Sequence, residues 1–442
     1  MKYVVVGGGI AGVSCANEIL RLERNPGAEV VLVSASTFVK SVDNFRKVGQ
    51  LGETFDVKEA DASEVFADPR LKFVNQKVIG WDAINKAICL ENNARVHFDK
   101  LCIATGSTPA EHDSYGYHPK LAWNRVLHLR DTYSAKTLQE KLGDAKRVVI
   151  VGNGGIATEL IYELKNVQIT WLVRDSWICA KFFPEDVEKF IEKRLLVGRA
   201  KGSKHDGVQK HLQYSTSSAP ESSSETVVTE SDRAKFHIPG PALGPDWCSG
   251  IDFNVSTDSE PREITIIRNA SANHFSWPNS QKDVIIGYEN LKDKTDHKMR
   301  VDLVIWAGGV VPNSDVWCDP RWQLKTTQKE WNGRYHGGIC IDDACQTSTP
   351  NVFACGDVCA LTCSETSPLW NQICLWTQAR QFGEVCGRSM VAGPAEARMQ
   401  NMYFEMFSHC TTFFGLKALT TSRFDEGDTT KRKCRVKSRM QE

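Results

Sequence analysis

Two glycine-rich segments carry the clearest chemistry in this 442-residue sequence. The first, "KYVVVGGGIAGVSCANEIL", places three glycines in GxGxxG spacing between an apolar strand pattern and a helix pattern. The first glycine permits a tight turn, the second lets a pyrophosphate approach the backbone, and the third lets the helix pack on the strand. The helix N-terminus then faces the phosphates. The candidate dinucleotide-binding residues of this unit are Gly7, Gly9, Ile10, Ala11 and Gly12.

The second segment, "KRVVIVGNGGIATELIYEL", repeats the strand, glycine turn and helix, with alanine in the place of the third glycine. Its candidate nucleotide-binding residues are Gly152, Gly154, Gly155, Ile156, Ala157 and Glu159. Each segment continues into a further apolar strand, which completes a βαβ unit. Two such units in one chain predict two dinucleotide sites.

The residue that ends each second strand helps to select the nucleotide. The strand "AEVVLVSAS" ends in Ser34, where an acidic residue usually binds the ribose, and a hydroxyl forms a weaker bond than a carboxylate. The strand "VQITWLVRD" ends at Val173 and Arg174, and an arginine there can pair with the 2′-phosphate of NADP. The alternative is that Arg174 is a solvated surface charge beside Asp175. The sequence therefore allows NADP as well as NAD.

Three further segments, "DKLCIATGSTP", "VDLVIWAGGVVPN" and "TSTPNVFACGDVC", each combine an apolar strand with a small-residue turn. With the glycine turns, this ordered set resembles the pyridine nucleotide-disulfide oxidoreductase family over residues 1 to about 398. The resemblance implies an α/β fold of two Rossmann-like domains, with FAD in the first site and NAD(P)H as co-substrate in the second. It implies FAD contacts for Ala104, Thr105, Gly106, Gly356 and Asp357, and a nucleotide contact for Gly308.

Many members of this family carry a redox-active pair of cysteines after the first βαβ unit. Here no cysteine lies between Cys15 and Cys89. We expect a loop after the second strand instead, and the side chains that it offers to the flavin are Lys40, Ser41, Asp43 and Asn44. Electrons must then leave the flavin by direct contact with oxygen, a quinone-like acceptor, or a metal or thiol of a partner.

Two residues are candidates for the flavin's immediate surroundings. The resemblance places Lys40 beside the isoalloxazine ring, where its cation would stabilise reduced flavin. An exposed lysine is the alternative. Trp376 lies in "LWTQARQ", on a helix whose N-terminal end the family directs at the flavin. Trp376 could shield the ring or stack on the nicotinamide, and an ordinary core aromatic residue would look the same in sequence.

The 15 cysteines include no CxxC pair, so we expect neither a zinc ribbon nor a thioredoxin-type redox pair, and no metal site. Most are expected to be buried small hydrophobic residues. Two looser sets leave open a disulfide reductase with relocated cysteines, which is the least favoured function. These sets are Cys340 with Cys345, and Cys355 with Cys359 and Cys363.

The domain boundaries follow from the order of the motifs. We expect a discontinuous FAD domain over residues 1–115 and 302–398, and an NAD(P) domain over 116–301. The serine-rich segment 199–262 has too few apolar residues to offset its ordering entropy, so we expect a disordered insertion. Residues 399–442 begin an α/β interface domain but end in a basic tail. This shortened core argues against dimerisation.

Lysine plus arginine and aspartate plus glutamate both number 54, and no long apolar run occurs. We therefore expect neither direct nucleic-acid binding nor a membrane span. The segments "PLWNQICLWTQARQFGEVCGRSM", "ALGPDW" and "FEMFSHCTTFFGLK" resemble a subgroup of the family that lacks the redox disulfide. That resemblance implies an oxidoreductase of the cytoplasm and nucleus, active in oxidative-stress defence and in protection of the tRNA ligase complex. A low-turnover flavin redox sensor is the alternative function.

Overall fold

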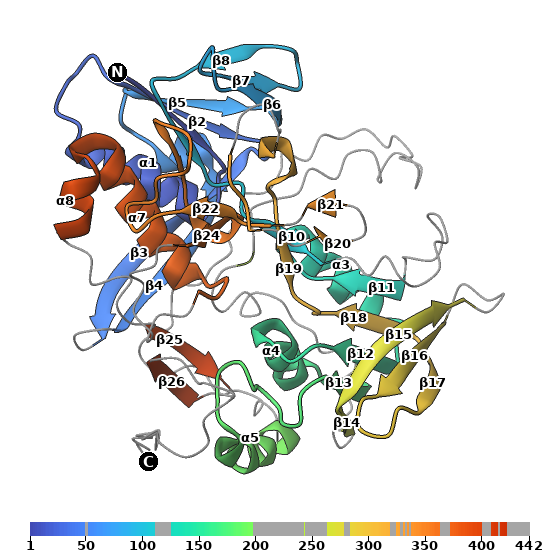
Figure 1. Ribbon diagram of the computed structural model, residues 1–442. Coiled ribbons are helices and arrows are strands. Elements are labelled where there is room, and N and C mark those ends of the chain that lie inside the picture. The colour runs from blue at the N-terminus through green and yellow to red at the C-terminus, as the bar shows by residue number, and fades with distance from the viewer. Residues whose placement is uncertain are drawn as a thin grey trace, which may run out of the picture.

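Two five-stranded parallel sheets organise the chain, each built on one glycine-rich unit (Figure 1). The first has the order β23 (Val352–Ala354), β9 (Lys100–Ile103), β1 (Lys2–Val6), β2 (Glu29–Ser34), β5 (Leu71–Asn75). The second has the order β11 (Val126–His128), β18 (Leu303–Trp306), β12 (Arg147–Val151), β13 (Gln168–Val173), β14 (Ile264–Arg268). In each sheet the strand before the glycine turn is central. The predicted fold class of two Rossmann-like domains is confirmed.

This computed structural model describes residues 1–48, 52–110, 125–197, 243, 263–277, 283–318, 324–327, 330–331, 334–335, 337–362, 372–399, 408–413 and 416–421. The expected insertion at 199–262 lies outside these residues except for Leu243, and so does the basic tail. Further described elements are α2 (Ala62–Val65), α5 (Glu185–Val197), α8 (Pro394–Met399), β20 (Glu330–Trp331), β21 (Arg334–Tyr335), β22 (Ile339–Ile341), β24 (Cys359–Leu361) and the 3-10 turns η2 (Asp315–Trp317) and η4 (Gly356–Val358).

Both central strands are buried on their two faces, which explains their unbroken apolar sequences. In β12, Val148 and Ile150 join the core that includes α3 (Thr132–Leu142) and α4 (Gly155–Glu163). The alternate residues, Val149 and Val151, join a second core with the antiparallel sheet β15 (Ala270–Ser276), β16 (Val284–Asn290), β17 (Asp296–Val301). The first sheet shares its core with a similar sheet, β6 (Val78–Asp82), β7 (Ala87–Leu90), β8 (Arg95–His97).

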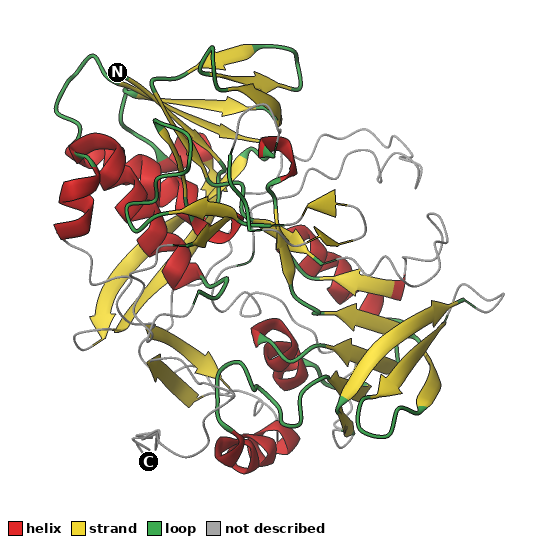
Figure 2. Cartoon of the chain, in the orientation of Figure 1, coloured by secondary structure: helices red, strands yellow, loops and turns green. Residues whose placement is uncertain are grey.

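Two helices from opposite ends of the chain pack closely on the first sheet (Figure 2). They are α1 (Ile10–Leu22) and α7 (Trp376–Ala392). Glycines four residues apart allow the approach: a Cβ on Gly383 would lie 2.3 Å from the Ala11 carbonyl oxygen, and one on Gly387 would lie 2.7 Å from the Cys15 oxygen. The C-terminal part of the domain is thereby held against the first glycine turn.

The two sheets are connected by paired crossing segments. β10 (Ser107–Pro109) and β19 (Val310–Pro312) form an antiparallel pair. Just beside this pair, the Thr105 hydroxyl donates to the Asn313 carbonyl at 2.8 Å, and the Asn313 side-chain amide donates to the Thr105 carbonyl at 2.8 Å. The turn after β9 is therefore fixed to the residue that follows β19.

The segment after β2 is a long β-hairpin, so the expected loop is wrong. β3 (Phe38–Val48) pairs antiparallel with β4 (Gly52–Asp61), and Lys40 lies directly opposite Glu59. In β4 the buried Phe55 and Val57 are separated by the polar Asp56, which is the period-2 pattern of a strand. Near β4 lies β25 (Ser408–Phe413), which pairs with β26 (Leu416–Thr421) in the described part of the C-terminal segment.

A buried ion pair anchors this hairpin to α7, and we expect its loss to destabilise the protein. Arg380 Nε donates to Glu53 Oε1 at 2.9 Å, and both side chains are almost fully buried. Arg380→Met leaves a buried carboxylate without its cation, which should cost about 3–5 kcal/mol of unfolding free energy. Urea denaturation measures this loss. Arg398→Met, at a half-exposed pair with Asp342, is the control and should cost less than about 1 kcal/mol.

Candidate cofactor sites

The first glycine turn combines two crowded positions with one open position. Gly7 has φ +129°, and a Cβ there would lie 2.1 Å from the Ala104 carbonyl oxygen. A Cβ on Gly12 would lie 2.0 Å from the Gly7 oxygen, so α1 packs directly on the turn. A Cβ on Gly9, by contrast, would meet no atom within 4 Å. The backbone is therefore accessible where a pyrophosphate would approach it, and the residues present fit the diphosphate of FAD.

The turns after β9 and β23 meet beside this first turn. Ser107 Oγ donates to Asp357 Oδ2 at 2.9 Å, and Arg130 Nε donates to the Ser107 carbonyl oxygen at 3.0 Å. Burial raises the pKa of Asp357, while the Ser107 hydrogen bond and the Arg130 charge act in the opposite direction. Gly356, at φ +77°, lies against Ala11. Residues 250 positions apart thus form one polar group at the edge of the first sheet.

Lys40 is fully buried, which excludes the exposed-lysine alternative. Its Nζ lies 3.3 Å from Glu59 Oε2, and the Thr132 hydroxyl donates to the same oxygen at 3.1 Å. Burial lowers the pKa of Lys40, and Glu59 opposes that shift. The Arg130 charge acts on both predicted FAD residues: it lowers the pKa of Lys40 and opposes the rise in the pKa of Asp357.

The other predicted hairpin residues do not join this group. Asp43 and Asn44 are exposed, and Asn44 Nδ2 donates to Asp56 Oδ2 at 2.7 Å within the hairpin. Ser41 is half-buried, and its hydroxyl lies 3.5 Å from the Lys58 carbonyl oxygen. Of the four predicted side chains, Lys40 alone is placed in the buried polar group.

Ser34 is buried at the end of β2, where its hydroxyl lies beside the glycine turn. A Cβ on Gly8 would lie 2.8 Å from Ser34 Oγ, which also accepts a bond from the Ser36 backbone N–H at 3.3 Å. The hydroxyl is therefore close enough to the turn for a ribose contact, but it already has a local backbone partner.

Trp376 is the first residue of α7, and it packs beside the first residue of α1. Its half-buried ring contacts the small apolar cluster of Ile10, Phe55 and Val57. A pocket opens next to it, lined by Gly356, Asp357, Gln372, Ile373, Cys374, Gln378, Ala379 and Phe382. Trp376 therefore packs between the hairpin and the start of α1.

The second glycine turn has the same construction as the first. Gly152 has φ +128°, and a Cβ there would lie 2.2 Å from the Ala307 carbonyl oxygen, whereas one on Gly154 would meet no atom within 4 Å. The Trp171 indole donates to the Gly152 carbonyl oxygen at 2.6 Å and fixes the turn to β13. Ala157 is fully buried, so alanine fits where the first unit needs Gly12. This geometry fits the diphosphate of NAD(P)H.

The remaining predicted nucleotide residues surround that turn. Gly155 and Ile156 begin α4 and are half-buried, as is Glu159 one turn further on. A Cβ on Gly308 would lie 2.6 Å from the Trp306 indole nitrogen, so the Trp306 ring can lie there only because Gly308 has no side chain.

Sequence reasoning missed Asn153, which lies in the second glycine turn. Its side-chain amide donates to Asp175 Oδ2 at 2.6 Å, and its oxygen accepts the Cys179 N–H at 2.6 Å.

Arg174 is exposed at the end of β13, and its neighbour Asp175 is bound by Asn153. We expect Arg174→Ala to raise the KM for NADPH roughly tenfold, because a charge-assisted bond to the 2′-phosphate contributes about 1.5–3 kcal/mol. The KM for NADH should change little. Steady-state kinetics with NADPH and with NADH measures the two KM values. Arg24→Ala, which changes an exposed arginine of the first domain, is the control. An equal change for both nucleotides would contradict a role in reading the 2′-phosphate.

The described cysteines form no disulfide. Cys345 Sγ is directed to the Phe382 carbonyl oxygen at 3.7 Å, and Cys359 Sγ donates to the Gly356 carbonyl oxygen at 3.0 Å. Cys355 instead contacts Cys102, with the sulfurs 3.4 Å apart. Cys363 lies outside the described residues. The described members of both predicted cysteine sets are therefore free thiols in this structure.

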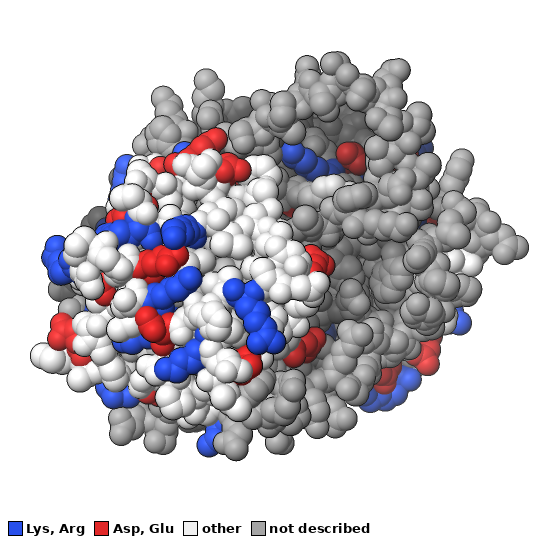
Figure 3. Space-filling view, turned by 90° about the horizontal axis from the view of Figure 1, so that it is seen from above, with Lys and Arg blue, Asp and Glu red and all other residues white. Residues whose placement is uncertain are grey.

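The described surface carries both signs of charge. Figure 3 shows lysine and arginine side chains interspersed with aspartate and glutamate over one face of the molecule. Such a mixed face does not provide the single-sign field that attracts nucleic acid. In the described part of the chain, the helices are too short or too polar to span a bilayer.

Comparison with known proteins defines the class. The family model described as pyridine nucleotide-disulphide oxidoreductase matches residues 1–236 and 257–383, so this chain belongs to that family of NAD(P)H-dependent oxidoreductases. Its cofactors are accordingly FAD and NAD(P)H. The chain is 35% identical over 435 residues to pyridine nucleotide-disulfide oxidoreductase domain-containing protein 1 of Drosophila melanogaster, covering 97% of this chain and 84% of the relative. The resemblance to the family and to this subgroup is confirmed.

Two solved structures share the fold. A water-forming NADH oxidase from Lactobacillus brevis bound to NADH aligns with a TM-score of 0.58 and 19% identity, covering 95% of this chain and 75% of that one. An NAD-dependent persulfide reductase from A. fulgidus aligns with a TM-score of 0.60 and 19% identity, covering 95% and 63%. At this identity the likeness is one of fold.

Proposed function

We propose that this protein oxidises NAD(P)H and passes the electrons from reduced FAD directly to an acceptor, without a redox disulfide. The observation that supports this most is the hairpin after β2, which has a buried Lys40–Glu59 pair where relatives with a redox disulfide carry cysteines. When bound, FAD supplies the two-electron chemistry, and the protein supplies binding, orientation and charge.

The described residues divide these tasks. The open backbone at Gly9 receives the FAD diphosphate, and the open backbone at Gly154 receives that of NAD(P)H. Asp357 accepts from the FAD hydroxyls while Ser107 and Arg130 hold its carboxylate. Trp376 and the hairpin limit the access of water. Lys40 contributes a positive charge on the flavin side of the domain.

Anaerobic stopped-flow spectroscopy tests the proposal. NADH or NADPH should bleach the flavin absorbance, and oxygen or a quinone should restore it rapidly in a second mixing step. Cys340→Ser, Cys345→Ala and Cys359→Ala should leave both rates near those of the wild type. A cysteine variant that keeps the first step and loses turnover would overturn direct transfer. A long-lived reduced complex with every acceptor would favour the redox-sensor alternative.

Lys40→Met should make the flavin harder to reduce. The change removes a buried cation and leaves Glu59, whose side chain is 11% exposed, with an uncompensated charge nearby. We expect the flavin midpoint potential to fall by about 30 mV or more, since 30 mV corresponds to ~1.4 kcal/mol for a two-electron couple. A dye-equilibration titration measures it. Lys58→Met, at an exposed lysine of the same hairpin, is the control and should leave the potential unchanged.

The family subgroup also suggests a cellular role. We propose residence in the cytoplasm and nucleus, a function in oxidative-stress defence, and protection of the tRNA ligase complex, on the basis of the resemblance to the subgroup. Affinity purification of the tagged protein from its native cells, with and without peroxide, tests the partnership. Failure to recover tRNA ligase under either condition would remove this part of the proposal and leave the chemistry untouched.

A further inference from the structure

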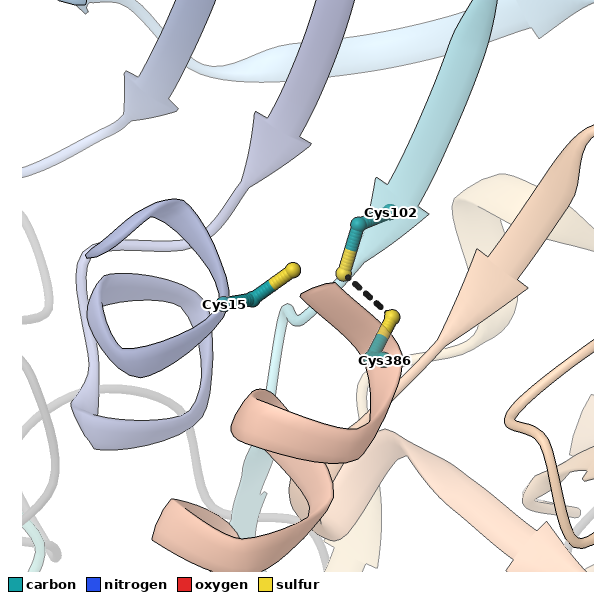
Figure 4. A group of neighbouring side chains, drawn as sticks. All are labelled: Cys15, Cys102 and Cys386. Atoms are coloured by element: carbon teal, nitrogen blue, oxygen red, sulfur yellow. Dashed lines mark hydrogen bonds between the residues drawn. The ribbon is translucent and has the colours of Figure 1, made fainter. Parts of the chain in front are cut away.

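A cluster of sulfur atoms lies in the core of the first domain (Figure 4). Cys102 Sγ lies 3.4 Å from Cys355 Sγ and 3.5 Å from Cys386 Sγ. Met390 Sδ lies 3.9 Å from the sulfurs of both Cys15 and Cys386. The thiols of Cys15, Cys102 and Cys386 all lie within 4.8 Å of one another. We call these five residues the sulfur cluster.

The fold assembles the sulfur cluster from four separate elements. Cys15 comes from α1 and Cys102 from β9, while Cys386 and Met390 come from α7. Cys355 follows directly after β23, the strand beside β9. The close packing of α1 on α7 brings the helical members together. No CxxC spacing is involved, which is why the sequence pattern predicted no metal site.

The sulfur cluster has the composition of a soft-metal site. Each of its members is 0% exposed and lies in an apolar core, and its described donors are sulfur. Thiolate and thioether ligands select soft ions such as Cu(I), and thiolates also bind zinc. Four sulfurs bound tetrahedrally at about 2.3 Å from a metal lie roughly 3.8 Å apart. The separations of 3.5 Å between Cys102 and Cys386 and of 3.9 Å from Met390 to Cys15 and to Cys386 are near that value.

Ligand type distinguishes the ions. The cluster offers the Met390 thioether beside its thiols, and all of these sulfurs lie in an apolar core. Thioether and thiolate sulfur together select Cu(I), whereas zinc is usually held by thiolate, imidazole or carboxylate ligands. A zinc ion with four thiolates would also leave two negative charges in a dry core.

We propose that the sulfur cluster is a binding site for one Cu(I) ion, held by the sulfurs of Cys15, Cys102 and Cys386 and by the Met390 thioether. Each thiol that binds as a thiolate releases its proton to solvent, and the ion enters as Cu(I), so no electron is transferred. The ion would link β9 to α1 and α7. The proposal does not rest on the proposed flavin chemistry.

The test uses the full-length, FAD-loaded protein from cells grown in copper-supplemented medium. After chelator washing, inductively coupled plasma mass spectrometry should find about one copper per chain, and X-ray absorption should show Cu(I) with sulfur ligands only. No retained copper, zinc in its place, or nitrogen and oxygen ligands would each overturn the proposal. The copper measurement does not depend on enzyme activity. The copper proposal can therefore fail while the proposed function stands, and the proposed function can fail while the copper proposal stands.

Two variants locate the ion. Cys102→Ala and Cys386→Ala should each reduce retained copper by about tenfold or more. Cys179→Ala is the matched control, because Cys179 is equally buried but lies in the second domain against Thr158. Equal copper in all variants, or equal loss in the control, would contradict the assignment. If the cluster variants do not fold, the X-ray absorption of the wild type still decides, since copper bound elsewhere would show other ligands.

Discussion

Gly154→Val should abolish efficient reduction by NAD(P)H while the protein remains folded and yellow. Gly154 has extended backbone angles, φ −93° and ψ −175°, and a Cβ there meets no protein atom within 4 Å. The valine is therefore compatible with the fold, but it fills the space that the diphosphate needs. Loss of one or two charge-assisted backbone bonds should raise the Kd for NAD(P)H about 100-fold, equivalent to ~2.7 kcal/mol.

Anaerobic titration of flavin bleaching against NADH and NADPH measures this effect, and bound FAD and unfolding midpoint serve as internal controls. Gly9→Val is the matched variant at the first turn, where the angles are also extended and a Cβ meets no atom within 4 Å. It should lose FAD instead. If Gly154→Val lost FAD or left NAD(P)H binding unchanged, the assignment of the two turns would be wrong.

Asp357→Asn should weaken FAD binding by about 10- to 100-fold. The substitution preserves size and an acceptor for Ser107, but it removes the charge on which Arg130 acts and which we propose accepts from the cofactor. Charge-assisted hydrogen bonds of this kind contribute about 1.5–3 kcal/mol. Equilibrium dialysis followed by flavin fluorescence gives the dissociation constant.

The control for Asp357→Asn is Asp99→Asn, at a carboxylate that is 58% exposed and lies near the chain N-terminus. That variant should retain FAD as the wild type does. A folded Asp357→Asn protein with wild-type affinity would show that the turn after β23 does not bind the cofactor.

The sequence predicted the positions at which the backbone is too crowded for any side chain. Gly7 and Gly152 are required because any side chain would meet a carbonyl oxygen of the neighbouring strand end. This requirement is local, so the GxGxxG spacing reveals it. The apolar strands before each turn were equally clear, because strands covered on both faces are apolar throughout.

Side chains brought together from distant segments could not be predicted in this way. Arg130 lies outside every recognised motif, yet it contacts Ser107 and acts on Asp357. The partner of Lys40 depends on the register of a hairpin, and a shift of one residue would replace Glu59. The sulfur cluster likewise joins residues up to 375 positions apart, since Cys15 contacts Met390.

Direct transfer from the flavin is tested most directly by counting electrons. Anaerobic titration of the FAD-loaded protein with a calibrated reductant should reach full reduction at two electrons per FAD, because the described cysteines form no disulfide that could accept a further pair. A redox disulfide is itself a two-electron couple, so a relay would consume four electrons per FAD. An end point at two electrons, unchanged in Cys345→Ala and Cys359→Ala, agrees with direct transfer. An end point at four would contradict it.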